Sequence, residues 1–213
     1  MTARAAWEDR GGKATRAQET ENIVFWLTPV EGVVPASITS PRLRLVQKNK
    51  SFEPHVLVVP VGSLVEFPNR DPFFHNVFSL FEGKRFDLGL YEAGTTRDVR
   101  FDKPGVSYIF CNIHPEMSAV VIAVQTPYYA SSDARGEITI RDVPAGRYTL
   151  HIWYEAALAE TLNAMTREIT VSEENLALGV LRLARTNVVQ SHKNKYGRDY
   201  DPPAPDSPAY PHP

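Results

Sequence analysis

The chain has 213 residues, and its 23 lysines and arginines nearly balance its 25 aspartates and glutamates. This balance disfavours nucleic acids and anionic membrane surfaces as partners, because either would call for a strongly basic surface. Apolar runs are short, and none approaches the roughly 18 to 20 residues that a membrane span requires. The length suffices for one large or two small domains, and the order of the predicted elements favours two.

The first twenty residues are polar and contain no apolar stretch of the kind found in a signal peptide. We therefore predict a flexible N-terminal segment over residues 1–20. If the protein is exported, we expect its signal peptide to be missing from this sequence.

Residues 21–125 hold short apolar and β-branched segments that Gly, Pro, Asn and Asp separate. This spacing is typical of an antiparallel β-sandwich or barrel, and no sustained helical periodicity appears. The sequence therefore predicts an all-β first domain, with strands expected at 23–27, 56–61, 63–67, 76–81, 96–101, 106–110 and 119–124.

The strand pattern starts again in residues 126–185 and predicts a second, smaller β-sandwich. Gly136–Trp153 alternates apolar and polar residues around a Pro-Ala-Gly turn, which is typical of a β-hairpin. We expect a further strand pair at Arg167–Val171 and Leu178–Leu183, and the best helical stretch of the chain at Ala156–Arg167. About 60 residues is near the lower limit for independent folding, so we expect this domain to lean on its neighbour.

Residues 186–213 form a tail in which tyrosines lie among many prolines. That composition cannot build a hydrophobic core of its own. We expect the tail to be extended, packed on a surface of the protein, or disordered.

The most informative segment of the sequence is Cys111-Asn-Ile-His114-Pro-Glu-Met117, which lies between two predicted strands. It brings a thiolate, an imidazole and a thioether within seven residues, and this soft ligand set selects copper over hard cations. His75, at the start of a predicted strand, supplies a second imidazole. Two histidines and one cysteine, with methionine as a long axial ligand, form the ligand set of a blue-copper electron-transfer site.

Cys111 is the only cysteine, which excludes an internal disulfide, a thiolate-rich structural zinc site and a two-cysteine binuclear copper centre. A lone buried cysteine is usually an inert small hydrophobe, and a lone histidine is usually a hydrogen-bonded structural residue. Packing alone gives no reason for all four side chains to converge. The other four histidines lack such company and are expected to be structural or solvent-facing: His55, His151, His192 and His212.

Residues 51–124 resemble the cupredoxins, and among them the amicyanin- and plastocyanin-like group. The likeness rests on the ligand loop Cys-x-x-His-x-x-Met and on further stretches, namely Ser51-Phe-Glu-Pro54, Val61-Gly-Ser-Leu-Val-Glu-Phe67-Pro-Asn69, His75-Asn-Val77, Lys103-Pro-Gly105 and Tyr108-x-x-Cys111. The resemblance implies a Greek-key β-sandwich that binds one copper ion per chain.

The same resemblance implies roles for residues around the metal. Asn76 is expected to tie the two ligand loops together and to help direct a backbone hydrogen bond toward the cysteine sulfur. Pro115 lacks an N–H and so removes one possible donor near the thiolate. His114 is expected to be the port through which electrons enter and leave, surrounded by Pro72, Phe73 and Pro115.

Residues 136–150 resemble the carboxypeptidase regulatory-like, transthyretin-type β-sandwich modules of extracytoplasmic proteins. The pattern Gly136-x-Ile-x-Ile-x-x-Val143-Pro-x-Gly146-x-Tyr148-x-Leu150 carries this likeness and implies no peptidase. We expect this domain or the tail to serve in docking to another protein.

Together, these features predict a periplasmic or extracellular protein that is not an enzyme and that transfers single electrons between transient redox partners. No nucleic-acid partner and no membrane span are expected. Two alternatives stay open, a periplasmic copper carrier or storage protein and a non-redox extracellular interaction module. The closed ligand set disfavours a carrier, which usually offers an open site rich in methionine or histidine.

Overall fold

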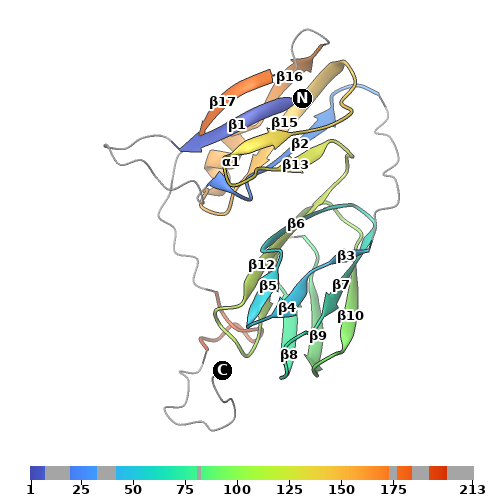
Figure 1. Cartoon of the computed structure of the whole chain (residues 1–213), viewed down its shortest axis with the longest axis vertical. Coiled ribbons are helices and arrows are strands. Elements are labelled where there is room, and N and C mark those ends of the chain that lie inside the picture. The colour runs from blue at the N-terminus through green and yellow to red at the C-terminus, as the bar shows by residue number, and fades with distance from the viewer. Residues whose placement is uncertain (8–19, 33–41, 81–82, 173–176, 184–191, 201–213) are drawn as a thin grey trace.

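The computed structural model describes residues 1–7, 20–32, 42–80, 83–172, 177–183 and 192–200 (Figure 1). Nearly all regular structure in these ranges is β-strand, with one short helix, α1 (Ala159–Met165), so the predicted all-β fold class is confirmed. No helix within the described ranges has the length and apolarity needed to cross a bilayer. The strands form two stacked units, which we call the host unit (the described residues within 1–29 and 128–183) and the inserted unit (the described residues within 43–124).

The inserted unit consists of two facing sheets and a small hairpin. The five-stranded sheet has the order β6 (Val56–Pro60), β12 (Ser118–Val124), β11 (Gly105–Cys111), β8 (His75–Ser79) and β9 (Phe86–Tyr91). The three-stranded sheet has the order β10 (Thr96–Phe101), β7 (Ser63–Pro68) and β3 (Leu43–Arg44), and the hairpin pairs β4 (Val46–Lys48) with β5 (Ser51–Glu53). Because side chains alternate along each strand, every second residue faces the core between the sheets, as do Phe67, Phe101, Ile109 and Val121.

The host unit is also a pair of facing sheets. One sheet has the order β14 (Glu137–Thr139), β1 (Thr2–Trp7) and β17 (Ala177–Leu183). The other has the order β13 (Tyr129–Ser131), β2 (Val24–Pro29), β15 (Gly146–Trp153) and β16 (Arg167–Val171). Their shared core includes Phe25, Leu27, Ile138 and Leu150, all of them buried.

The host unit is built from two separate parts of the chain, and the inserted unit lies between them in sequence (Figure 1). The predicted flexible segment 1–20 is wrong for residues 2–7, which pair with β14 and β17. The predicted first domain 21–125 is wrong for residues 24–29, which pair with β13 and β15. Both errors arise because the partner strands lie far away in sequence and leave no local signal. Residues 8–19 lie outside the described ranges.

Two strand pairings predicted for the second domain are also wrong. The predicted hairpin does not form, because β14 pairs with β1 in one sheet while β15 pairs with β2 and β16 in the other. β17 runs parallel to β1 instead of pairing with β16. The strands β14 to β17 and α1 lie close to their predicted positions, whereas β13 was not predicted. Alternation of apolar and polar residues does not specify which strand is the partner.

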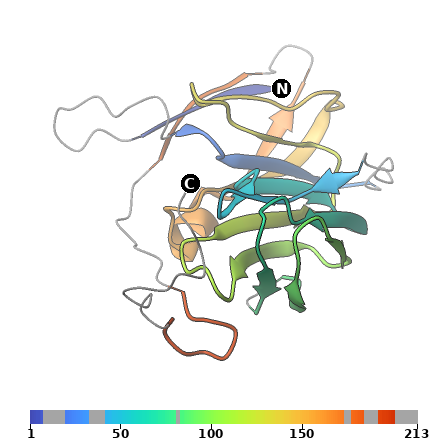
Figure 2. The same cartoon turned by 60° about the horizontal axis from the view of Figure 1, so that its bottom comes forward.

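A third apolar cluster joins the two units, because β12 and β2 bury both of their faces. Val121 points into the core of the inserted unit, whereas Val120 and Ile122 point toward the host unit. Val24 of β2 and Trp153 of β15 pack in the same cluster from the host side. Figure 2 shows the sheets stacked in layers across this contact. The five-stranded sheet that carries the donor residues described below therefore packs directly on the host unit.

A polar contact also links the two units. His55, between β5 and β6, donates from Nδ1 to the carbonyl of Ser118 at 3.2 Å and from Nε2 to Glu155 of the host unit at 2.7 Å. Each ring nitrogen of His55 thus has its own hydrogen-bond acceptor, an arrangement that suits the protonated imidazolium form. The hydrogen bond with Glu155 raises the pKa of His55, and desolvation only partly opposes it.

We expect the His55–Glu155 pair to stabilise the protein in acid more than in alkali. Because the pKa of His55 is raised on folding, its contribution is complete below the unfolded value of about 6.5 and is lost as the pH rises through the folded value. His55→Gln should lower the free energy of unfolding by less than about 1 kcal/mol, since the side chains are 40% and 43% exposed. Urea unfolding at acid and alkaline pH measures this. Glu155→Gln should remove the same pH dependence, and equal losses at both pH values would contradict the prediction.

Candidate metal centre

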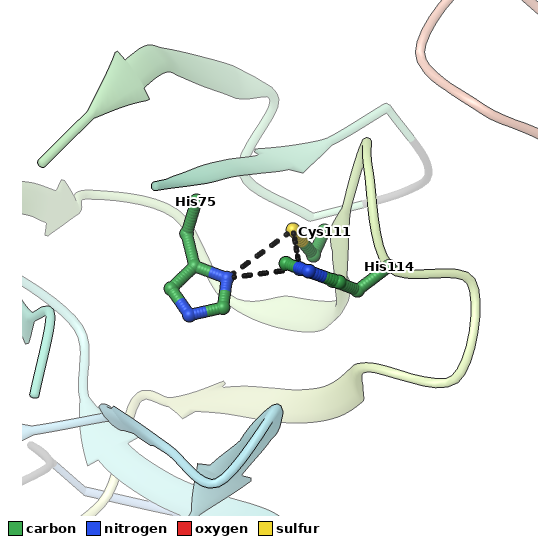
Figure 3. Close-up of side chains that lie close together, drawn as sticks. All are labelled: His75, Cys111 and His114. Atoms are coloured by element: carbon green, nitrogen blue, oxygen red, sulfur yellow. Dashed lines mark hydrogen bonds between the residues drawn. The ribbon is translucent and has the colours of Figure 1, made fainter. Parts of the chain in front are cut away.

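Three donor side chains of the inserted unit point toward one another (Figure 3). His75 begins β8, Cys111 ends β11, and His114 lies in the segment 111–117, which we call the ligand loop. Cys111 Sγ lies 3.6 Å from Nδ1 of His75 and 3.5 Å from Nδ1 of His114, and the two Nδ1 atoms lie 3.2 Å apart. All three side chains are buried, and in the described part of the chain they are the one group of histidine, cysteine and carboxylate side chains placed to hold a metal ion.

The triangle of donor atoms has the size that a metal ion requires. A point equidistant from the three atoms lies about 2.0 Å from each, close to the usual metal–nitrogen distance of about 2.0–2.1 Å and slightly short of a metal–sulfur distance of about 2.3 Å. One sulfur and two imidazole nitrogens form a soft, trigonal donor set. The residues present therefore fit a mononuclear site for a soft transition-metal ion.

Asp71 holds the ring of His75 in the orientation that turns Nδ1 toward the other donors. Nε2 of His75 donates to Oδ2 of Asp71 at 2.9 Å, so the lone pair of the neutral ring lies on Nδ1. Burial lowers the pKa of His75, although Asp71 acts in the opposite direction. His75 is therefore neutral at pH 7, as a metal ligand must be.

The turn of the β4–β5 hairpin fixes the carboxylate of Asp71. Its Oδ1 accepts the N–H of Asn49 at 2.6 Å, and its Oδ2 accepts the N–H of Lys50 at 3.0 Å. Both turn residues have positive φ angles, 55° and 53°, as a two-residue hairpin turn requires. Burial opposes ionisation, but hydrogen bonds from Lys50, His75 and Asn49 hold the pKa of Asp71 below its ordinary value. A buried negative charge therefore lies behind His75.

The thiol of Cys111 lies among backbone N–H groups. Burial raises the pKa of Cys111, and hydrogen bonds from the N–H groups of Ile113, Asn76 and His114 act in the opposite direction. The same groups would stabilise a thiolate once a metal displaced the thiol proton. The carbonyl of Asn76 also accepts the N–H of Asn112 at 2.9 Å, so one residue of β8 is hydrogen-bonded to the ligand loop.

Apolar residues adjoin His114. Burial and the neighbouring His75 lower the pKa of His114 to about 4, so this ring is also neutral at pH 7. The ring of Phe73 lies beside both imidazoles, with centroid distances of 5.3 Å to His75 and 5.5 Å to His114. Phe73 is half-buried, whereas Pro72 and Pro115 are exposed. The ring of His114 therefore lies just beneath an apolar part of the surface.

Met117 is fully buried in the core cluster that also contains Cys111. Its backbone closes the ligand loop, because its N–H donates to the carbonyl of His114 at 3.1 Å and its carbonyl accepts the N–H of Cys111 at 3.2 Å. These bonds hold three of the four predicted ligands, Cys111, His114 and Met117, in one compact loop, and the fourth, His75, lies on β8. The axial role of Met117 stays a prediction.

The role of Asp71 and the contacts of two tail residues were not predicted from the sequence. His192, expected to be structural or solvent-facing, donates to the carbonyl of Pro115 at 2.7 Å, and Tyr200 donates to the carbonyl of Cys111 at 2.9 Å. Residues 192–200 of the tail thus pack on the ligand loop, and its other residues lie outside the described ranges. A carboxylate four residues before His75 was the one local signal for Asp71, and it is not specific.

No protein-family model matches the chain, and no curated protein matches it. Among solved structures, a purple cupredoxin from Nitrosopumilus maritimus is 23% identical with a TM-score of 0.35, over 38% of this chain and 99% of that one. A reduced amicyanin mutant is 20% identical with a TM-score of 0.37, over 46% and 99%. A Cu-containing nitrite reductase (NirK) from Thermus scotoductus SA-01 is 25% identical with a TM-score of 0.38, over 57% of this chain and only 28% of the reductase. With such low TM-scores, the function is inferred from the donor geometry.

Proposed function

We propose that the protein binds one copper ion per chain through His75, Cys111 and His114, with Met117 as a weak axial ligand, and transfers single electrons. The observation that carries this proposal is the buried triangle of one sulfur and two nitrogen atoms, whose centre lies about 2.0 Å from each donor. A thiolate with two imidazoles is the trigonal set of blue-copper sites, and copper bound there supplies a one-electron redox couple.

The donor set favours copper over zinc. Structural zinc sites are tetrahedral and usually contain two or more cysteines, whereas Cys111 is the only cysteine of this chain. Catalytic zinc sites keep a position for water, but all three donors here are buried. A buried thioether at Met117, in the same core cluster as Cys111, is a soft ligand that suits copper.

The surroundings of the donors favour electron transfer over copper carriage. Asp71 fixes His75, and backbone hydrogen bonds within the ligand loop, together with the bond that the N–H of Asn112 donates to the carbonyl of Asn76, fix the loop itself. A donor set held on a rigid β-framework needs little rearrangement when the charge at the site changes. The burial of all three donors is also unsuited to a carrier, which must hand its ion over.

The apolar residues Pro72, Phe73 and Pro115, next to the site in sequence or in space, suit a transient redox partner. Pro72 and Pro115 are exposed and Phe73 is half-buried beside the His114 ring, so this ring is the proposed electron port. Redox encounters use small interfaces that release quickly. The near-neutral net charge favours only weak electrostatic steering of that partner.

The location and the role of the host unit are further parts of the proposal. A buried soft-metal site of this kind suits a periplasmic or extracellular protein that exchanges electrons with other proteins. The host unit, in which residues 136–150 resemble a carboxypeptidase regulatory-like module, would serve as a docking or spacing element beside the inserted unit.

The visible absorption spectrum of the protein loaded with copper tests the function. An intense charge-transfer band in the red, with one copper per chain by elemental analysis, is the expected result. Colourless binding of Cu(I) alone would point to a copper carrier instead. Absence of copper binding would overturn the proposal and favour an interaction module.

We expect Asp71→Asn to weaken copper binding by about 10- to 100-fold, the usual effect of removing a partner that orients a ligand. The amide group cannot accept every N–H that the carboxylate accepts, and the negative charge behind His75 is lost. The carboxylate charge stabilises Cu(II) more than Cu(I), because Cu(II) carries the higher charge. Its loss should therefore lower the affinity for Cu(II) more than the affinity for Cu(I), and the reduction potential should rise.

Competition with a chromophoric chelator measures both affinities for this variant. Asp102→Asn is the control, since Asp102 pairs with Lys84 at the surface, away from the donors. Equal copper affinities in the Asp71 variant and the unchanged protein would show that Asp71 does not position His75.

A further inference from the structure

Residues 192–200, which we call the clasp, lie against the ligand loop. In Figure 1 the clasp is the red segment beside the loop that joins β11 and β12. It makes three hydrogen bonds to that loop: Tyr200 Oη to the Cys111 carbonyl at 2.9 Å, His192 Nε2 to the Pro115 carbonyl at 2.7 Å, and the Lys195 N–H to Oδ1 of Asn112 at 3.0 Å. These bonds fix the loop at its first ligand and on both sides of His114.

Aromatic stacking anchors the clasp to the sheet beneath the loop. The ring of His192 stacks on Phe110 of β11, with centroids 3.9 Å apart and planes inclined by 20°. Tyr200 meets the edge of His192 at 5.2 Å, and Phe110 packs on Phe78 of β8 at 5.9 Å. The clasp therefore packs on Phe110 and also donates a hydrogen bond to the carbonyl of the next residue, Cys111.

A chain of charged and amide groups connects the clasp to the other ligand strand. Lys195 Nζ donates to Oδ2 of Asp87 at 2.9 Å, and Oδ1 of Asp87 accepts Nδ2 of Asn76 at 2.7 Å. Asn76 follows His75 directly and accepts the N–H of Asn112. The clasp is thus hydrogen-bonded, directly or through one residue, to both segments that carry the donors.

The clasp has an internal structure that makes it a fixed support. Oδ1 of Asn194 accepts the N–H groups of Tyr196 and Arg198, and the N–H of Asn194 donates to the Arg198 carbonyl. Lys193 pairs with Asp199 at 2.6 Å. Hydrogen bonds within the segment hold its turn, so the side chains at its two ends, His192 and Tyr200, reach the ligand loop together.

From these contacts we infer that Tyr200 and His192 are positioning residues of the metal site. Neither supplies a ligand. Tyr200 holds the carbonyl of Cys111 and His192 that of Pro115, so the ligand loop keeps one conformation whether or not a metal is bound. This inference rests on the proposed function for its consequence, which is tighter copper binding, but not for the restraint of the loop itself.

Tyr200→Phe and His192→Phe test the inference, because each keeps an aromatic ring and removes one hydrogen bond to the loop. Tyr148→Phe is the matched control: its hydroxyl also donates to a carbonyl, that of Pro144, at 2.9 Å, but it lies in the host unit. In the metal-free protein, the backbone amides of Asn112 and Met117 should exchange with solvent about tenfold faster in both clasp variants. Copper affinity, measured by competition with a chromophoric chelator, should fall about tenfold.

The two measurements separate the clasp from the copper proposal. Unchanged amide exchange in both clasp variants, or an equal increase in Tyr148→Phe, would overturn the inference whatever the protein binds. If amide exchange were faster in the clasp variants but their copper affinity equalled that of the unchanged protein, the clasp would restrain the loop without positioning the ligands. That result would also overturn the inference. If the unchanged protein bound no copper, the proposed function would fail, and with it the positioning of a metal site.

Discussion

Cys111→Ser is expected to abolish the intense visible band of the copper-loaded protein. That band requires a copper–thiolate bond, and a serine hydroxyl in the same place is a much poorer ligand for a soft metal. The sheets should stay folded, because the substituted side chain is small and sits at the end of β11. Its buried hydroxyl should cost about 1–3 kcal/mol of unfolding free energy unless it finds a partner.

Absorption spectra of the copper-loaded variant test this result, with circular dichroism as the check on folding. His55→Gln is the control, since His55 lies at the contact between the two units and not among the donors. A folded Cys111→Ser protein that kept the band would remove Cys111 from the site and with it the proposed function.

Trp153→Ala is expected to lower the free energy of unfolding by about 3–5 kcal/mol. Trp153 is only 3% exposed and packs in the apolar cluster between the host and inserted units with Val24 and Ile122. Its removal leaves a cavity at this contact, so both units lose support. Copper affinity should change little, because the donors lie at the end of the sheet and not in this cluster.

Denaturant unfolding with two probes measures the effect of Trp153→Ala on each unit. The two tryptophans that remain in the variant, Trp7 and Trp26, lie on strands of the host unit, so their fluorescence follows that unit, while the copper absorption follows the inserted unit. Both midpoints should fall in the variant. Leu90→Ala, at a site 59% exposed on β9, should leave them unchanged. Unchanged midpoints in Trp153→Ala would show that the cluster does not couple the units.

The ligand loop was predictable because its chemistry is local. Cys111, His114 and Met117 fall within seven residues between two strands, and few structural reasons would place a thiol, an imidazole and a thioether there together. The structure brings His75 to Cys111 and His114 as expected. Many strand positions were also predictable, since alternation and turn residues are properties of short segments. The strands β3, β4, β5, β9 and β13 were not predicted.

Several of the misses share one physical cause, which is separation in sequence. β1 and β2 find their partners across the whole inserted unit, and Ala3 and Ala5 of β1 are too small to mark a buried strand. Asp71 depends on a hairpin turn more than twenty residues earlier, and Tyr200 reaches Cys111 from the tail. Such contacts depend on the tertiary fold, and no local sequence pattern indicates them.

The interruption of the host unit by the inserted unit sets an order for synthesis on the ribosome. Every strand of the inserted unit leaves the ribosome before β13, so that unit is expected to fold while β1 and β2 still await their partners. The clasp follows last, since roughly 75 residues separate β12 from Tyr200 and take about 4 to 15 seconds at ~5–20 residues per second. In the nascent chain, the ligand loop is therefore expected to form before Tyr200 and His192 can make their hydrogen bonds to it.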